Sequence, residues 1–112
     1  MSDFGFAIKQ NDLLPVLTAT LKDALGVAVD LTGATAVFRM GLVGAATLKV
    51  NTAATVDPDQ VANKGKITYN WTGTDTDTVG IYEGEFTVTL SGGKQQTFPN
   101  PRHIVVHIDR RK

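Results

Sequence analysis

The chain has 112 residues, a length that suits one domain with one hydrophobic core, which we assign to residues 1–112. Apolar residues make up 42% of it and charged residues 20%, and the 11 basic side chains balance the 11 acidic ones, so no net charge favours a nucleic acid or an anionic membrane as partner. The absence of cysteine excludes disulfides, thiolate metal sites and cysteine nucleophiles.

The N-terminal residues come first in chain order. They lack a basic segment followed by a long apolar one, and no apolar run in the sequence reaches 18 residues. We therefore expect neither a secretion signal nor a membrane span, and the lack of cysteine suits folding in a reducing cytoplasm.

Four stretches alternate apolar and polar residues with a period of two, which is typical of half-buried strands. They are residues 17–22, 67–71, 82–90 and 104–108. In the third and clearest stretch, one face carries aromatic and aliphatic side chains and the other carries glutamate and threonine. Each stretch therefore offers one apolar face to a common core.

Segments rich in glycine, aspartate and asparagine separate these stretches and predict turns. They are residues 23–26, 32–33, 41–44, 57–59, 63–65 and 91–93. About seven to nine short strands result, without a helical run, and this pattern predicts an all-β, immunoglobulin-like antiparallel β-sandwich. Residues 42–54 carry few distinctive residues and are open to interpretation as a mobile edge region.

Two local features refine the predicted sandwich. The glycines of residues 91–93 favour a tight hairpin, because glycine accepts the positive φ that such loops need. Residues 74–82 resemble the tyrosine corner of immunoglobulin-like sandwiches. The Tyr82 hydroxyl is therefore expected to donate a hydrogen bond to backbone upstream of it.

The titratable residues do not assemble into a catalytic group. His103 and His107 lie four residues apart on one predicted strand, so about 13 Å separates them and they cannot bind one metal ion. Glu83 and Glu85 share a strand face about 7 Å apart, near the spacing of the carboxyl groups in inverting glycosidases. Threonines occupy the rest of that face, where a sugar-binding site needs aromatic platforms, so we interpret both glutamates as exposed surface charges.

Two aspartate pairs invite a calcium interpretation. Asp57 and Asp59 precede the predicted strand at residues 66–71, and Asp75 and Asp77 follow it. At about 20 Å apart the two pairs cannot share an ion, and aspartate is common in turns because its side chain binds nearby backbone N–H groups. We therefore expect turn and cap roles.

Several cations gather near the C-terminus. Arg102, His103 and residues 110–112 form a basic end without an aromatic-rich groove, so nucleic acid is not expected as a partner. From the titratable residues and these cations together, we predict no enzymatic activity, no catalytic residue, no cofactor and no metal site.

The aromatic residues divide into two groups. One falls on the predicted inward faces and is interpreted as core: Phe38, Tyr69, Trp71 and Phe86. The other lies near an edge or a loop and supplies the candidate partner contacts: Phe4, Phe6 and, with the proline beside it, Phe98 and Pro99. Closure of a sheet edge is the alternative role for this second group.

Two blocks of the sequence carry a resemblance to a known family. The first comprises residues 8–12, Pro15, residues 17–21 and residues 30–40. The second comprises Trp71, Thr72, Asp75, Thr76, Gly80, residues 82–88 and residues 93–100. Together they resemble the immunoglobulin-like N-terminal domain of phage baseplate upper proteins.

The resemblance implies a virion component with a β-sandwich fold and no enzyme activity, and it supplies no catalytic residues. Baseplate members usually continue into further domains, whereas we expect a single domain here. We therefore expect an accessory module that is made in the host cytoplasm and docks onto tail, baseplate or capsid proteins in the virion, with a homo-oligomer as a further option. The alternatives are a capsid decoration protein and a carbohydrate- or host-surface-binding module, which needs an exposed aromatic platform.

Overall fold

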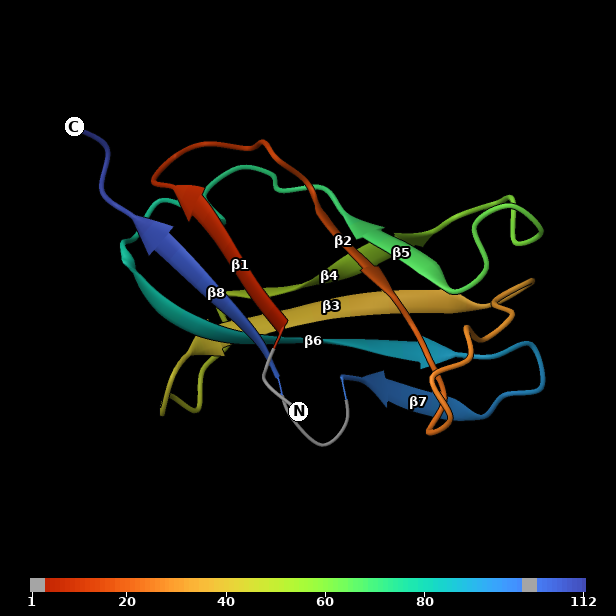
Figure 1. The fold of residues 1–112 in the computed structure, drawn as a ribbon. Coiled ribbons are helices and arrows are strands. Elements are labelled where there is room, and N and C mark those ends of the chain that lie inside the picture. Colours follow the sequence, from red (N-terminus) through yellow and green to blue (C-terminus); the bar gives the residue numbers. More distant parts are fainter. Residues whose placement is uncertain (1–3, 100–102) are drawn as a thin grey trace.

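The computed structural model describes residues 4–99 and 103–112, which form an all-β molecule (Figure 1). These two ranges contain eight strands, within the predicted number, and no helix able to cross a membrane. The strands are β1 (Phe4–Lys9), β2 (Leu17–Thr20), β3 (Thr35–Leu42), β4 (Val50–Val56), β5 (Lys66–Tyr69), β6 (Gly80–Thr89), β7 (Gln95–Phe98) and β8 (Ile104–Asp109).

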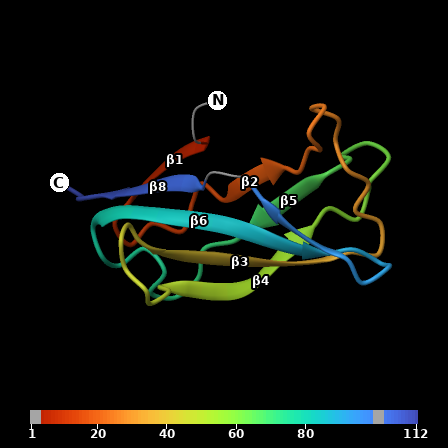
Figure 2. The ribbon, with the colours of Figure 1, turned by 90° about the horizontal axis from the view of Figure 1, so that it is seen from below.

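The strands form one mixed sheet in the order β1-β8-β6-β3-β4-β5-β2. Strand β3 occupies one edge of β6, and β7 and β8 share the other edge, one after the other. The sheet curls until β2 and β5 lie across from β6 and β3, which gives a nearly barrel-shaped molecule (Figure 2).

One pairing corrects the predicted antiparallel arrangement. β1 and β8 run parallel, from Phe4 opposite Ile104 to Lys9 opposite Asp109, while every other pair of neighbouring strands is antiparallel. A hairpin forces its two strands to run antiparallel, but β1 and β8 are separated by nearly the whole chain. Because no hairpin connects them, no turn signal in the sequence could predict that β1 and β8 run parallel.

The predicted inward faces are confirmed by burial. In β6 the buried residues alternate with half-buried ones, and Tyr82, Phe86 and Val88 are fully buried. The same alternation holds in β2, β5 and β8. The period of two therefore identified the core side of four strands correctly.

The predicted aromatic core is also confirmed. The Phe38 ring lies at its centre, with centroids 4.7 Å from Tyr69, 5.0 Å from Phe86 and 5.9 Å from Trp71. Gly84 makes room for this ring, because a Cβ at position 84 would lie 3.0 Å from two Phe38 ring carbons. Backbone and aromatic ring thus approach closely in the middle of β6.

Residues 42–54 differ from the expected edge region. They contain most of β4, which pairs with β3 through residues 50–54 and with β5 through Thr55 and Val56. β4 therefore lies inside the sheet and joins its two halves. Val50 is the only buried residue of this strand, so its sequence carries almost no alternation that would have revealed the position.

The predicted hairpin at residues 91–93 and the predicted hydrogen bond of the Tyr82 hydroxyl are both confirmed. The Leu90 N–H donates to the Lys94 carbonyl at 2.8 Å, and Gly93 adopts a φ of 89°, which closes the hairpin between β6 and β7. The Tyr82 hydroxyl donates to the Thr78 carbonyl at 2.7 Å, as expected of a tyrosine corner. Both contacts fix the ends of β6.

Candidate docking surfaces

A groove of about 910 Å³ opens between β2 and β7. Residues 18–20 and 22–26 line one wall, and residues 96–99 line the other. The groove lies where the curled sheet fails to close, because no strand within residues 4–99 and 103–112 pairs with the second edge of either β2 or β7.

The β2 wall presents main-chain groups of a free strand edge. The Leu21 N–H donates to the Gly65 carbonyl at 2.7 Å and continues the register in which Ala19 faces Ile67. Residues of an antiparallel strand alternate between those that bond to the neighbour and those that point away from it. Thr18 and Thr20 therefore direct their N–H and C=O groups away from β5.

A tight turn extends this wall beyond β2. The Asp23 carboxylate accepts the N–H groups of Leu25 and Val27 at 2.9 and 3.0 Å, and the Asp23 N–H donates to the Val27 carbonyl. The turn exposes 88% of Leu25 at its tip. Lys22 lies between this turn and β2, where it continues the alternation of Thr18 and Thr20.

The β7 wall is a shorter free edge. Because Leu90 donates to Lys94, the alternation turns the main-chain groups of Gln96 toward β6 and those of Gln95 and Thr97 away from it. Pro99 follows in the same alternation, and proline has no N–H to offer a further strand. The β7 edge therefore ends at Pro99.

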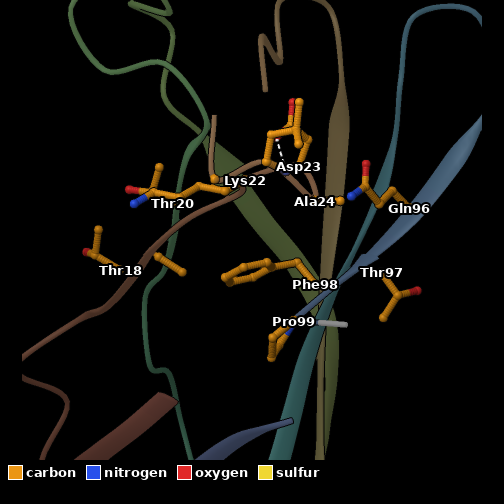
Figure 3. A pocket seen from close by; sticks show the side chains of 12 residues that line it. Thr18, Thr20, Lys22, Asp23, Ala24, Gln96, Thr97, Phe98 and Pro99 are labelled. Atoms are coloured by element: carbon orange, nitrogen blue, oxygen red, sulfur yellow. Dashed lines mark hydrogen bonds between the residues drawn. The ribbon is translucent and has the colours of Figure 1, made fainter. Parts of the chain in front are cut away.

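Phe98 belongs to the apolar part of the groove. Its side chain is half-buried, packs against the core, and points from β7 across the groove toward β2 (Figure 3). On the other face of β7, the Thr97 hydroxyl lies 3.4 Å from that of Thr87. Phe98 thus adds an aromatic ring to the apolar part of the lining, to which Ala19, Ala24, Leu25 and Pro99 also contribute.

The structure describes the side chains of three of the four predicted contact residues, and these lie in two places. Phe98 and Pro99 come together in the groove, whereas Phe6 is half-buried on β1 with its ring centroid 5.8 Å from that of Trp71. The side chain of Phe4 lies outside the described part of the chain. Contact with a partner remains a prediction for each of them.

The β2 wall was not identified from the sequence. Thr18, Thr20 and Lys22 are ordinary exposed residues of an alternating strand, and nothing in their pattern distinguishes an edge strand from an internal one. Their role depends on the order of strand pairing. Next to this wall, only residues 23–26 had a recognisable sequence pattern, which predicted a turn.

A second exposed surface lies at the hairpin between β3 and β4. We call it the apolar hairpin surface; its members are 43–56% exposed, and they are Leu42, Val43, Leu48, Val79 and Ile81. The Val43 N–H donates to the Ile81 carbonyl at 3.2 Å, which joins the hairpin to the start of β6. Exposed apolar side chains that gather near one hairpin are candidates for a protein contact.

On the outer face of β6, His103 lies close to Glu83 and Glu85, although it is distant from them in the sequence. His103 lies with Nδ1 3.4 Å from the Glu83 carboxylate and Nε2 3.9 Å from that of Glu85. Each nitrogen of the imidazole thus faces a different glutamate. The residues described by the structure include no group of three or more histidines and carboxylates arranged to hold a metal ion.

Three of the four aspartates in the predicted pairs bind turn backbone, as expected. Asp57 accepts the N–H of Asp59 at 2.8 Å, and Asp59 accepts that of Ala62 at 3.0 Å. Asp75 accepts the N–H of Thr72 at 3.0 Å. The fourth, Asp77, instead forms an ion pair.

Two of these aspartates also take part in pKa shifts. Asp75 accepts the Tyr69 hydroxyl at 2.5 Å, and burial, reinforced by this carboxylate, raises the pKa of Tyr69 to about 12. The Lys49 ammonium lies 2.6 Å from Asp77, and its hydrogen bond lowers the pKa of that carboxyl. Both carboxylates lie in the turn before β6, which also holds the Thr78 carbonyl that binds Tyr82.

Comparisons with known proteins identify no relative: no protein-family model matches the chain, and no curated protein matches it.

Proposed function

We propose that this chain is a non-enzymatic structural module of a bacteriophage virion, which docks onto tail, baseplate or capsid proteins. The main support for the docking role is the groove, which lies between the free edges of β2 and β7. The assignment to a virion is supported by the resemblance of the two sequence blocks described above to the baseplate domain.

Free strand edges support a docking role because their N–H and C=O groups can form main-chain hydrogen bonds with another chain. Monomeric proteins usually protect such edges with proline, charge or a covering segment. Here Pro99 protects one end of β7, while the main-chain groups of Thr18 and Thr20 face a groove with an apolar side chain in it. That combination suits a segment of another protein.

We also propose that the fold is a variant of the immunoglobulin-like sandwich, with β1, β8, β6, β3 and β4 opposed to β5 and β2. The tyrosine corner supports this assignment, since Tyr82 lies near the start of a strand and bonds to backbone four residues upstream. In this interpretation β4 crosses from one sheet to the other, which accounts for the nearly barrel-shaped outline.

The carbohydrate-binding alternative has less support. A sugar platform needs exposed aromatic rings, and Trp71, Tyr69 and Tyr82 are at most 3% exposed. Capsid decoration belongs to the same class as the proposed function and differs from it in copy number.

Quantitative mass spectrometry of particles of the phage that encodes this chain tests the proposed function. We expect the chain at a fixed ratio to the major capsid protein. A copy number close to that of the capsid or tail-tube protein would identify a decoration, and a much lower one a baseplate or collar part. Absence from purified particles would contradict the virion role.

A substitution in β2 tests the docking surface itself. Thr18→Pro removes an N–H that points into the groove without breaking a bond to β5, so the fold should persist while attachment to particles lacking the chain is lost. Thr18→Val, which keeps the N–H, is the matched control and should attach normally. Equal attachment of both variants would exclude the β2 edge as the docking surface.

A further inference from the structure

We propose that the groove binds an extended acidic segment of a partner protein, added as a strand to the free edge of β2. This inference rests on the docking function proposed above and identifies the chemistry of the segment that docks. It follows from three properties of the groove: the main-chain groups of its β2 wall, the apolar side chain opposite them, and the charge of Lys22.

The β2 wall provides a template three residues long. Thr18, Thr20 and Lys22 alternate with the buried residues that face β5, so each directs one N–H and one C=O to the groove. No turn or side-chain hydrogen bond in the described ranges uses these groups. At about 7 Å between alternate residues, they match the repeat of an extended chain and of no other secondary structure.

The β7 edge is the weaker template. Only Gln95 and Thr97 direct main-chain groups away from β6, and Pro99, which lacks an N–H, ends the series. The incoming strand therefore pairs with β2 and meets β7 through side chains. Phe98 is the side chain that reaches toward it (Figure 3).

The two faces of the incoming strand meet different surroundings. Side chains opposite buried Ala19 point inward toward Phe98, so apolar residues suit these positions. Side chains opposite Thr18, Thr20 and Lys22 point to the exposed face of β2. The segment should therefore alternate apolar and polar residues.

Charge determines which polar residue suits the strand. Asp23 and Lys22 are the charged residues among those that line the groove, and the Asp23 carboxylate already accepts two backbone N–H groups of its turn. Lys22 is exposed and forms no ion pair within residues 4–99 and 103–112. A carboxylate opposite Lys22 therefore complements the charge of this exposed side chain.

A second copy of this chain is a poorer occupant than a foreign segment. Its free edges are those of β2, with Thr18, Thr20 and Lys22, of β7, with Gln95 and Thr97, and of β1 (Phe4–Lys9), which pairs with β8 alone. None of these residues has a carboxylate, and pairing two β2 edges would bring two lysines together. The foreign acidic strand satisfies both the main-chain groups and the charge.

Selection of a displayed library of random ten-residue peptides tests the proposal. Against the wild-type chain we expect alternating peptides enriched in Asp and Glu, and against Lys22→Glu we expect enrichment in Lys and Arg instead. Lys9→Glu, which makes the same charge change on β1, should select the wild-type set. For one selected peptide at low salt, Lys22→Glu should weaken binding about tenfold, and added salt should reduce the difference.

The remaining outcomes distinguish the acidic character of the segment from its addition as a strand to β2. Peptides that bind wild type but not Thr18→Pro, without preference for acidic residues, would overturn the acidic segment and retain strand addition. Failure to select any peptide, or equal binding to Thr18→Pro, would overturn strand addition at β2 as well. Self-association that Thr18→Pro abolishes would replace the foreign segment with a second copy.

Discussion

Gln60 is one of two buried polar residues in the described core, and its amide joins three chain segments. Its Oε1 accepts the N–H groups of Leu31 at 3.0 Å and Gly65 at 2.9 Å, while Nε2 donates to the Asp57 carbonyl at 2.8 Å. The loop before β3 is thereby attached to the turn before β5. Nothing in the sequence distinguishes Gln60 from an exposed glutamine.

We expect Gln60→Ala to destabilise the fold by about 2 to 6 kcal/mol, because it leaves two buried N–H groups without an acceptor at about 1 to 3 kcal/mol each. Urea denaturation measures the change. Gln95→Ala, at an exposed position of β7, is the control and should change stability by less than about 0.5 kcal/mol. Equal stability of the two variants would show that water replaces the Gln60 amide.

Tyr69 makes the fold sensitive to alkali. Its pKa rises from 10.0 to about 12 in the folded chain, so between these values the folded state holds a proton that the unfolded state has lost. The contribution of Tyr69 to the free energy of unfolding is therefore fully present below pH 10 and decreases as the pH rises toward 12. Burial raises the pKa of Tyr82 as well and acts in the same direction.

We expect Tyr69→Phe to flatten the alkaline decrease, since phenylalanine has no proton to lose, and to lower stability near neutral pH because the bond to Asp75 disappears. Unfolding free energies measured from pH 9 to pH 12 test both effects. Thr74→Val, which removes an exposed hydroxyl from the same turn, should retain the wild-type slope. An unchanged slope in Tyr69→Phe would assign the decrease to Tyr82.

At the scale of elements, β1 depends on contacts distant in sequence. It pairs with β8 alone, and the Phe6 ring packs beside Trp71, the single tryptophan of the chain. Trp71 is only 3% exposed, so its fluorescence reports how well β1 covers it. Phe6, which the sequence suggested as a partner contact, therefore also closes the core.

We expect Phe6→Ala to lower stability by about 1 to 2 kcal/mol, less than for a fully buried ring, and to shift Trp71 emission to longer wavelength as water reaches the indole. Leu25→Ala removes a side chain that is 88% exposed and is the control for both measurements. Unchanged emission in Phe6→Ala would show that the ring does not cover Trp71, and would favour the partner role.

The predictable elements are those with a strong difference between their two faces. β2, β5, β6 and β8 bury every second residue, and the period of two located them. β4 buries Val50 alone and β7 buries none of its four residues, so neither carried that signal. Pro99 and Phe98 were identified as unusual near a loop, but the other wall of their groove depends on pairing order, which alternation within one strand does not encode.

At the scale of the whole molecule, the apolar hairpin surface and the net charge act together. The chain has a formal net charge of zero at pH 7 and an isoelectric point near 6.7, so copies do not repel one another at neutral pH. The apolar hairpin surface exposes about half of each of its five side chains. Apolar contact without charge repulsion favours weak self-association at this surface.

We expect sedimentation velocity near pH 7 to reveal a reversible dimer at high concentration, weakened by Leu48→Lys, which places a charge in the apolar contact. Leu25→Lys adds the same charge at the groove turn and is the matched control, because the net charge of the molecule changes equally in both variants. A loss of association in Leu48→Lys alone assigns the contact to the hairpin, whereas an equal loss in both assigns it to net charge. A chain that stays monomeric at all concentrations would contradict the expectation and leave the hairpin free for a different protein.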